Sequence, residues 1–384
     1  MKKFGKFLCL CLAFFLITGF YPSRIVKAEG ENLEIKGKSA ILMEPYTKTI
    51  LYENNIDEKT APASITKIMS LLLVMEAIDN KTLSLEDVLT CSDHAAGMGG
   101  SQIWLEPGEA MTADDLLKAT VIASANDATV VLGEAIAGSE EGFVQMMNEK
   151  AKTLGMSNTN FINCTGLDAE GHYSTAHDVA IMSCELIKYE LIKRYTTVWM
   201  DSLRDGESEL VNTNKLVRFY EGTTGLKTGT TSTAGYCLSA SAMRDGTEFV
   251  AVIMGSEASN DRFESAKKLL NYGFANFSLT EIHPEKSEAF SVEIDDGEKK
   301  KFAAIPDGYL KLLLKKNEGK EIIQKVHFED DIEAPVRKGD KVGNIDVFMG
   351  DEQIGSIDIK AAENVEKMSF FTALKWLLSG LVTL

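Results

Sequence analysis

The chain is organised around residues 63–67, whose sequence is Ala-Ser-Ile-Thr-Lys. Pro62 precedes this stretch and an apolar run follows it at 68–75, which predicts a buried helix beginning here. Because residues three apart lie on one helical face, the hydroxyl of Ser64 and the amine of Lys67 are predicted to be neighbours. A neutral amine at that place can take the hydroxyl proton during nucleophilic attack. Alone, the spacing is equally typical of a helix cap followed by a solvated lysine.

The N-terminus has the pattern of a secretory signal peptide. Three lysines at positions 2, 3 and 6 precede an apolar run at 8–17, and Val26 and Ala28 supply the cleavage positions. The run is short for a membrane span, so a retained anchor is the less favoured alternative. We expect residues 1–28 to be removed and the protein to be exported to the outer face of the cytoplasmic membrane or the cell wall.

Cleavage after Ala28 leaves a strongly acidic protein. The chain of 384 residues has 40 Lys and Arg against 57 Asp and Glu. Five of the basic residues and none of the acidic ones lie in the signal peptide, so 35 basic residues remain and the net charge becomes −22. Such a charge excludes nucleic acid as an expected partner, because phosphates require basic patches. It suits a soluble extracytoplasmic protein.

The cysteines and histidines show no spacing typical of a metal site, so neither a metal nor a cofactor is expected. The cysteines that follow the signal peptide are widely separated, without a Cys-x-x-Cys motif, and we expect buried free thiols, with one disulfide as the alternative. The histidines are interpreted as loop and surface residues. These residues are Cys91, Cys164, Cys184 and Cys237, and His94, His172, His177, His283 and His327.

Periodicity divides the mature chain into an α+β domain and a small β-rich domain. Residues 29–278 combine helical patterns with a hairpin pattern at 37–54 and period-two strands near 222–255, which predicts an antiparallel sheet flanked by helices. Residues 279–360 carry short strand patterns and acidic turns, typical of a second, β-rich domain.

Residues 361–384 form a third segment with an apolar stripe. The stripe is short for a membrane span and is interrupted by Lys375. It is typical of an amphipathic helix that lies on a membrane surface, with Trp376 at the headgroup level. The alternative is a helix packed against its own protein. The stripe consists of Phe371, Leu374, Leu377, Leu378 and Leu381.

Two further motifs can carry chemistry. Ser124-Ala125-Asn126 lies between two helical patterns, the first of which has Thr112 as its predicted N-cap. It presents a hydroxyl and an amide on a tight turn, although capping alone would explain the same residues. Lys227-Thr228-Gly229 leads into the period-two strands.

Ser64-x-x-Lys67, Ser124-x-Asn126 and Lys-Thr-Gly from Lys227 follow one another at spacings of 60 and 103 residues. With these motifs the chain resembles the serine penicillin-binding and β-lactamase superfamily, and most of all its low-molecular-mass D-alanyl-D-alanine carboxypeptidases, the peptidase S11-like family. Thr-Gly-Leu-Asp at 165–168, the β-rich domain and the amphipathic tail extend the resemblance over nearly the whole chain. It implies a β-lactamase/transpeptidase-like catalytic domain.

The resemblance implies a serine-type carboxypeptidase that removes the terminal D-alanine from peptidoglycan stem pentapeptides through an acyl-enzyme on Ser64. β-Lactam antibiotics would acylate the same serine as covalent inhibitors. Lys67 would be the base, and Ser124 would pass a proton to the leaving amine. Asn126 would hold the substrate's peptide bond. Lys227 would act as a second cation that, together with burial, lowers the pKa of Lys67.

The same resemblance implies the substrate-binding residues. The backbone N–H groups of Ser64 and Thr230 would form the oxyanion hole. The strand that contains Gly229 could pair its edge with an extended peptide. Thr228, Thr231 and Arg262 would bind the terminal carboxylate.

Two alternatives belong to other functional classes. A class A β-lactamase needs a glutamate for deacylation, but Glu170 lacks the Glu-x-x-x-Asn context and Glu209 lies too far from Ser124. A non-catalytic wall-binding scaffold is disfavoured by the intact set of motifs. Many members of the family that the chain resembles carry His-Gly-Leu-Asp, whereas here Cys164-Thr165 precedes Gly-Leu-Asp, which leaves the role of that loop open.

Overall fold

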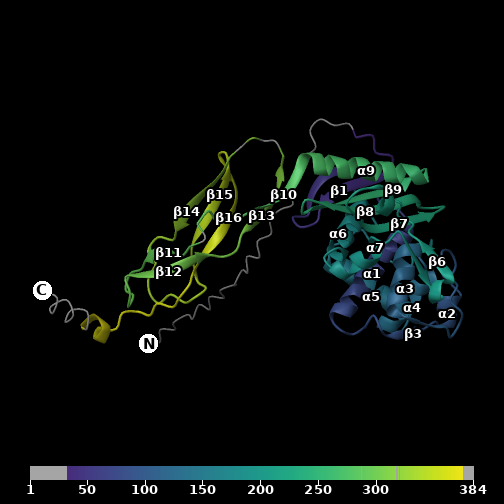
Figure 1. Ribbon diagram of the computed structural model, residues 1–384, viewed down its shortest axis with the longest axis horizontal. Helices are drawn as coiled ribbons and strands as arrows, with labels where there is room; N and C mark the ends of the chain where they lie inside the picture. Colours follow the sequence, from purple (N-terminus) through teal and green to yellow (C-terminus); the bar gives the residue numbers. More distant parts are fainter. Residues whose placement is uncertain (1–32, 287, 317–318, 320, 375–384) are drawn as a thin grey trace, which may run out of the picture.

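The computed structural model describes residues 33–286, 288–316, 319 and 321–374. The predicted signal peptide at 1–28 lies outside these described residues. Figure 1 shows one domain in which helices surround a sheet and a second domain built of strands, which meet near β10. This is the α+β, two-domain arrangement that the sequence predicted.

A five-stranded antiparallel sheet in the order β2-β1-β9-β8-β7 forms the centre of the first domain. The predicted hairpin at 37–54 supplies its first two strands, and the period-two segment near 222–255 supplies the other three. The order leaves β7 at an edge of the sheet. The strands are β1 (Ser39–Glu44), β2 (Thr49–Asn54), β7 (Thr223–Thr231), β8 (Gly235–Arg244) and β9 (Thr247–Ser256).

Two hydrophobic cores lie on the two faces of this sheet. Alternate side chains of β1 point to opposite faces, so that Ile41 and Met43 belong to one core and Ala40 and Leu42 to the other. α9 (Ser259–Asn276) covers the second face with Phe263, Leu269 and Leu270. Leu216 of α8 (Leu216–Phe219) packs in the same core, whereas α1 (Lys67–Asp79) and α3 to α6, between residues 113 and 186, lie on the opposite side of the sheet (Figure 1).

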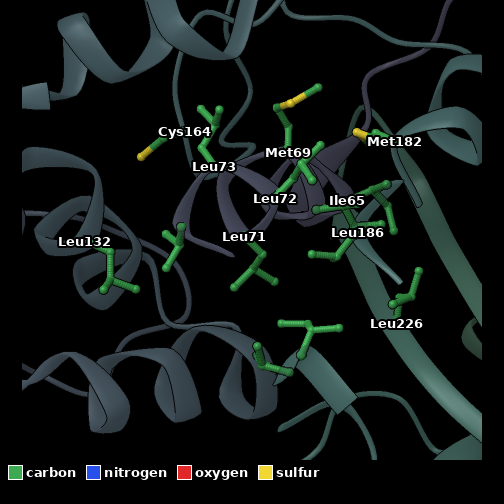
Figure 2. Close-up of a cluster of buried hydrophobic side chains, with 14 of the residues drawn as sticks. Ile65, Met69, Leu71, Leu72, Leu73, Leu132, Cys164, Met182, Leu186 and Leu226 are labelled. Carbon is green, nitrogen blue, oxygen red and sulfur yellow. The ribbon is translucent and has the colours of Figure 1, made fainter. Parts of the chain in front are cut away.

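α1 (Lys67–Asp79) is the central helix of the larger core. It has buried side chains on all of its faces, as the apolar run at 68–75 predicted. Figure 2 shows Met69, Leu71, Leu72 and Leu73 of α1 directed toward different neighbouring elements. Because α1 is enclosed by protein, the residues at its N-terminal end occupy a fixed position.

The remaining elements of the first domain surround α1 and the sheet. Thr112 caps α3 by accepting a hydrogen bond from the backbone N–H of Asp115, as predicted. The helices are α2 (Asp93–Ala96), α3 (Ala113–Lys118), α4 (Asn126–Ala137), α5 (Glu140–Thr153), α6 (Ala176–Leu186), α7 (Lys193–Thr196) and α8 (Leu216–Phe219), and the strands are β3 (Val88–Thr90), β4 (Ala110–Thr112), β5 (Met200–Leu203) and β6 (Ser208–Val211).

The second domain has its own core and its own sheet, in the order β11-β12-β16-β15-β14, beside the pair β10-β13. β10 begins at Phe277, which packs in a core of the first domain, and ends at Ile282, which packs in the core of the second. The strands are β10 (Phe277–Ile282), β11 (Phe290–Glu293), β12 (Lys301–Pro306), β13 (Leu310–Lys315), β14 (Ile322–Phe328), β15 (Lys341–Met349) and β16 (Glu352–Ala361).

The helix predicted over 361–384 begins later than expected. Ala361 is the last residue of β16, the buried Val365 pairs with Val336, and Met368 donates its N–H to the carbonyl of Asp296, so residues 361–368 belong to the β-rich domain. Residues 370–374 are helical, with Phe370 and Phe371 exposed by 76% and 80%. Trp376 lies outside the described residues. Within the described part of the chain, no helix is long and apolar enough to cross a membrane.

Candidate active site

Ser64 and Lys67 lie where a short turn enters α1. Ala63–Thr66 form a single 3-10 turn, and Lys67 is the first residue of the α-helix. The Nζ atom of Lys67 donates a hydrogen bond of 3.0 Å to Oγ of Ser64. The three-residue spacing therefore brings the hydroxyl and the amine together, as expected.

The amine of Lys67 is fully buried and makes two further hydrogen bonds. It donates to Oδ1 of Asn126 at 2.6 Å and to the backbone carbonyl of Thr165 at 2.7 Å. Burial lowers the pKa of Lys67 to about 7, although the nearby Cys164 and Asp127 act in the opposite direction. A substantial fraction of Lys67 is therefore neutral near neutral pH.

Lys227 is a second buried lysine, on β7. Burial, followed by the charges of Lys67 and Arg262, lowers the pKa of Lys227 well below its ordinary value. Lys227 was expected, together with burial, to lower the pKa of Lys67 as a neighbouring cation. The structure corrects this emphasis, because burial is the dominant cause at Lys67 and the repulsion between the two amines acts on Lys227.

Ser124 and Asn126 lie in the segment between α3 and α4, and Asn126 contacts the amine of Lys67. Ser124 has a left-handed backbone with φ +63°, and its buried Oγ has no hydrogen-bond partner among the described residues. The amide of Asn126 accepts from Lys67 and donates to the carbonyl of Gly99 at 2.6 Å. The orientation of this amide is thus fixed by a partner on each side.

The edge strand β7 passes close to the backbone of Ser64. A Cβ atom at Gly229 would lie 2.9 Å from the carbonyl oxygen of Pro62 and 3.0 Å from the backbone N of Ser64. Only a glycine permits this approach without a shift. The close approach of Gly229 brings the backbone of the adjacent Thr230 near that of Ser64. The N–H groups of these two residues are the ones expected to form the oxyanion hole.

Thr228 and Thr231 are part of β7, and Arg262 contacts this strand from α9. Arg262 is buried on α9, and its Nη1 donates to the carbonyl of Gly229 at 2.8 Å and to Oγ1 of Thr230 at 3.1 Å. Thr231 Oγ1 donates to Oδ1 of Asp168 at 2.8 Å. Thr228 and Thr231 therefore lie on β7 and Arg262 lies on α9 beside it, where its guanidinium supports the strand.

Thr228 contacts a neighbouring loop instead. Its Oγ1 donates a hydrogen bond of 2.7 Å to Oγ1 of Thr213. The loop residue Thr213 in turn donates its backbone N–H to the carbonyl of Ile122, on the turn that precedes Ser124. This contact joins β7 to the element that carries Ser124.

A loop at 163–173, whose role the sequence left open, packs directly on the Ser64 turn. Gly166 has φ +87°, and a Cβ atom there would lie only 1.8 Å from the carbonyl oxygen of Ala63. The same loop supplies the Thr165 carbonyl that Lys67 contacts. Together with Pro62 and Ala63, the segment from Gly166 to Tyr173 lines a cavity of about 440 Å³.

His172 was expected on the surface but is buried, with 6% of its area exposed. Its Nδ1 accepts the backbone N–H of Ile162 at 3.1 Å, which leaves Nε2 to donate to Oγ1 of Thr66 at 2.9 Å. Burial lowers the pKa of His172 to about 4. No sequence signal marked this contact, because it joins residues that are 106 positions apart.

Comparison with known proteins places this geometry in a family. Residues 25–258 match the Peptidase_S11 family, described as D-alanyl-D-alanine carboxypeptidase. The chain belongs to this family. Residues 277–367 match the C-terminal domain of penicillin-binding protein 5, which confirms the resemblance that the motifs suggested and the β-rich second domain.

Individual members of the S11 family cover nearly the whole chain. D-alanyl-D-alanine carboxypeptidase DacF of Bacillus subtilis (strain 168) is 41% identical over 95% of this chain and 96% of its own length. DacC of Escherichia coli (strain K12) is 33% identical over 94% of this chain and 91% of its own.

Solved structures agree with this assignment. Penicillin-binding protein 5 from Haemophilus influenzae has a TM-score of 0.76 at 27% identity, covering 88% of this chain and all of that one. Penicillin-binding protein D2 from Listeria monocytogenes, in an ampicillin-bound form, has a TM-score of 0.58 at 32% identity. It covers 64% of this chain and all of its own.

This S11-family chain shows no competing chemistry near the site. Within the described ranges, no group of three or more His, Cys, Asp or Glu side chains could hold a metal ion. Cys164 lies beside Lys67, but burial and the nearby Glu140 raise the pKa of its thiol well above the ordinary value. A protonated buried thiol is a poor nucleophile, so Cys164 is not suited to nucleophilic attack.

Proposed function

We propose that Ser64, Lys67 and Ser124 carry out the D-alanyl-D-alanine carboxypeptidase reaction of this chain. The observation that carries the assignment is the 3.0 Å contact between Oγ of Ser64 and a fully buried amine whose pKa is lowered to about 7. A base whose pKa lies near the working pH is well suited to proton transfer.

In the acylation step, neutral Lys67 takes the proton of Ser64 while Oγ attacks the carbonyl carbon of the penultimate D-alanine. The backbone N–H groups of Ser64 and Thr230 stabilise the oxyanion that forms. The C–N bond then breaks, and the terminal D-alanine leaves as an amine that receives a proton through Ser124. The buried Oγ of Ser124 supports this role, because no hydrogen-bond partner among the described residues would compete for it. Water later hydrolyses the ester on Ser64.

Substrate binding is assigned to Asn126 and to residues along β7. Because β7 is an edge strand, its free side can pair with the extended end of a stem peptide. Asn126 would hold the peptide carbonyl on the acyl side, and Lys227 would stabilise negative charge on the bound peptide. The terminal carboxylate would lie near Thr228, Thr231 and Arg262. The remaining part of the site consists of the backbone of Gly229 and Thr230.

Labelling with a fluorescent penicillin tests the nucleophile. A fragment of residues 29–369 ends after the last residues that pair in the β-rich domain. It should be labelled covalently, and Ser64→Ala should abolish the label. The same fragment should release D-alanine from diacetyl-Lys-D-Ala-D-Ala. Release of D-alanine by Ser64→Ala would reject this nucleophile, and rapid turnover of penicillin would favour the β-lactamase alternative.

We place the protein outside the cytoplasm, with residues 1–28 as its signal peptide and its C-terminal end at the membrane surface. Support for the membrane contact comes from Phe370 and Phe371, which are strongly exposed in the helical segment 370–374. Sedimentation with anionic vesicles tests it. Phe370→Ser with Phe371→Ser should reduce co-sedimentation of the mature chain. Tyr309→Ser, at an exposed ring in the β-rich domain, should not. Equal binding by all three proteins would contradict the assignment.

A further inference from the structure

The third hydrogen-bond acceptor of Lys67, the carbonyl of Thr165, is held in place by two side chains outside the three family motifs. Main-chain carbonyls on loops can rotate unless both ends of their peptide groups are bonded. Here the Thr165 carbonyl lies 2.7 Å from Nζ of Lys67. The backbone N–H groups of Cys164, Thr165 and Gly166 each donate a hydrogen bond to a side chain.

Asn163 fixes the peptide group that contacts Lys67. The carbonyl of Thr165 and the N–H of Gly166 belong to one planar unit. Oδ1 of Asn163 accepts that N–H at 2.7 Å, and it also accepts the N–H and the hydroxyl of Thr165, each at 3.2 Å. Nδ2 of Asn163 donates to the carbonyl of Leu167 at 2.8 Å. The Asn163 side chain binds the N–H end of this planar unit, and it thereby fixes the direction in which the Thr165 carbonyl points at the other end.

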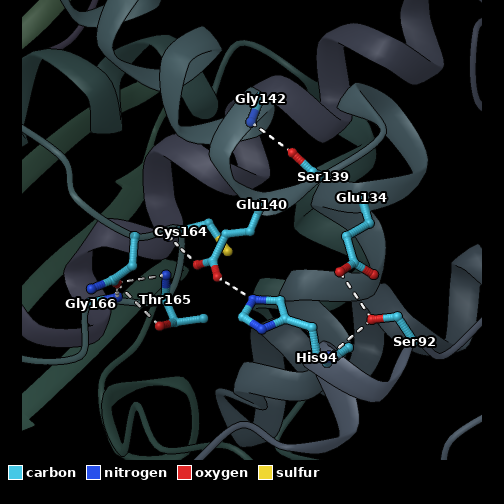
Figure 3. Close-up of polar contacts among 11 residues, drawn as sticks. Ser92, His94, Glu134, Ser139, Glu140, Gly142, Cys164, Thr165 and Gly166 are labelled. Carbon is cyan, nitrogen blue, oxygen red and sulfur yellow. Dashed lines mark hydrogen bonds and ion pairs between the residues drawn. The ribbon is translucent and has the colours of Figure 1, made fainter.

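Glu140 fixes Cys164, the residue that precedes Thr165 in the loop. Its Oε1 accepts the backbone N–H of Cys164 at 3.0 Å, while the Cys164 carbonyl accepts from Oγ of Ser70 at 2.6 Å. Oε2 of Glu140 lies 2.7 Å from Nε2 of His94, and this hydrogen bond raises the pKa of His94. Figure 3 shows the carboxylate of Glu140 between His94 and the backbone of Cys164.

We propose that Asn163 and Glu140 are positioning residues of the acylation step, which hold the Thr165 carbonyl against Lys67 and so determine how readily the amine loses its proton. The proposal rests on the role assigned to Lys67 above. Neither residue touches Ser64 or the substrate, and both act through the loop backbone.

The physical consequence has a definite sign. A carbonyl accepts a hydrogen bond from the ammonium form more favourably than from the amine, so it raises the pKa of Lys67 relative to a site without it. Loss of the carbonyl should therefore lower the pKa of Lys67. The other titratable groups around the amine are Asp127 on α4, Cys164 on the loop and Lys227 on β7, and the substitutions below leave all three in place.

The test is the pH profile of acylation by benzylpenicillin, measured per titrated active site on the full mature chain between pH 5 and pH 9. The acid limb of this profile is the pH range in which the rate falls as Lys67 becomes protonated. Asn163→Ala and Glu140→Ala should each move the acid limb to lower pH, by about one pH unit for Asn163→Ala. The limiting rate should fall by about tenfold, because the amine is less well oriented. Glu140→Gln keeps an oxygen that can accept the Cys164 N–H and should restore the wild-type limb.

Ser139→Ala is the matched control. Ser139 precedes Glu140, and its Oγ caps α5 by accepting the N–H of Gly142 at 3.1 Å, without a contact to the loop. It should lower thermal stability and leave the acid limb unchanged. An unshifted limb in both alanine variants, or an equal shift in Ser139→Ala, would overturn the proposal. Absence of Ser64-dependent acylation in the wild type would instead overturn the proposed function.

Discussion

The proposed chemistry depends on the burial of one side chain, that of Lys67. Its amine is enclosed on all sides, yet it has three oxygen acceptors, on Ser64, Asn126 and Thr165. The acceptors make burial of the ammonium tolerable, and the low dielectric keeps the neutral form accessible. The same residue can therefore exist in both protonation states, which an acid–base catalyst requires.

The acylation rate should follow the protonation of Lys67. If the neutral amine acts as the proposed base, its pKa of about 7 means that the rate should fall as the pH drops below 7 and level off above it. Lys67→Arg keeps a positive charge but stays protonated at all these pH values, so acylation should fall by about 10²- to 10⁴-fold. Stopped-flow measurement of penicillin acylation checks both statements. A flat profile between pH 5 and pH 8 would contradict them.

His172 should make the protein sensitive to acid. Its pKa is about 4 in the folded state and 6.5 in an unfolded chain, so the unfolded state binds the proton first as the pH falls. The stability that neutral His172 contributes is complete above pH 6.5 and is lost progressively toward pH 4, by about 3 kcal/mol. Urea unfolding at pH 7, 5.5 and 4 should show a smaller loss for His172→Gln than for wild type.

The outcome for His172 has a built-in comparison. His177 is one-third exposed on its side chain and carries no comparable burial, so His177→Gln should retain the wild-type loss between pH 7 and pH 4. Equal acid sensitivity of His172→Gln and wild type would show that another group is responsible.

At the residue scale, motif spacing predicted the residues that meet at the amine, and it did so because the chemistry demands specific side chains. Asn163, Glu140 and His172 could not be predicted in the same way. They act on backbone groups, and a backbone group leaves no residue type in the sequence to mark its partner. The left-handed conformation of Ser124 was equally invisible, since serine has no preference for it.

At the scale of elements, the close approach of three segments forms the site. The turn before α1 lies between β7 on one side and the loop 163–173 on the other, and a glycine permits each approach, Gly229 and Gly166. Side chains at either position would push the elements apart.

Gly166→Ala should therefore damage the site, and Gly155→Ala should not. Both glycines have positive φ, +87° and +77°, but the added methyl group meets the Ala63 carbonyl at 1.8 Å in the first case and nothing within 4 Å in the second. We expect a loss of about 3 kcal/mol for Gly166→Ala and about 1 kcal/mol for Gly155→Ala. Penicillin acylation should slow by tenfold or more only for Gly166→Ala. Equal effects of the two substitutions on acylation would contradict this steric explanation.

Strand and helix patterns predicted most elements, because burial on one or two faces imposes a period on the sequence. The tail helix is the instructive failure. The predicted helix began at residue 361, whereas Ala361 and Val365 complete the β-rich core by pairing with Ala304 and Val336, which are distant in the sequence. Periodicity over a short window cannot show which partner an apolar residue will have.

At the scale of the whole molecule, catalysis and the second domain are separable. All residues of the proposed site lie between Ser64 and Arg262, in the first domain. The second domain has a separate core, and the junction includes the hydrogen bond from the N–H of Leu279 to Oγ1 of Thr247. A fragment of residues 29–280 keeps Phe277 and Leu279 at their positions in the first domain.

This fragment should be acylated by penicillin within about twofold of the rate for the mature chain, because no substrate-contacting group is removed. Its melting temperature should fall, since the partner strand of β10 is lost. Acylation and circular dichroism measure the two quantities. A folded fragment that acylates more than tenfold slower would show that the second domain shapes the site.

The four cysteines of the described chain are all buried and unpaired, as the sequence predicted. The buried thiols can also report on local opening of the structure. An alkylating reagent reaches each one only when its surroundings open, and each sits in a different region, from β8 for Cys237 to the active-site loop for Cys164. The alkylation rate of Cys164 would therefore report how often the loop that holds the base leaves its place, in the unmodified enzyme and without any added probe.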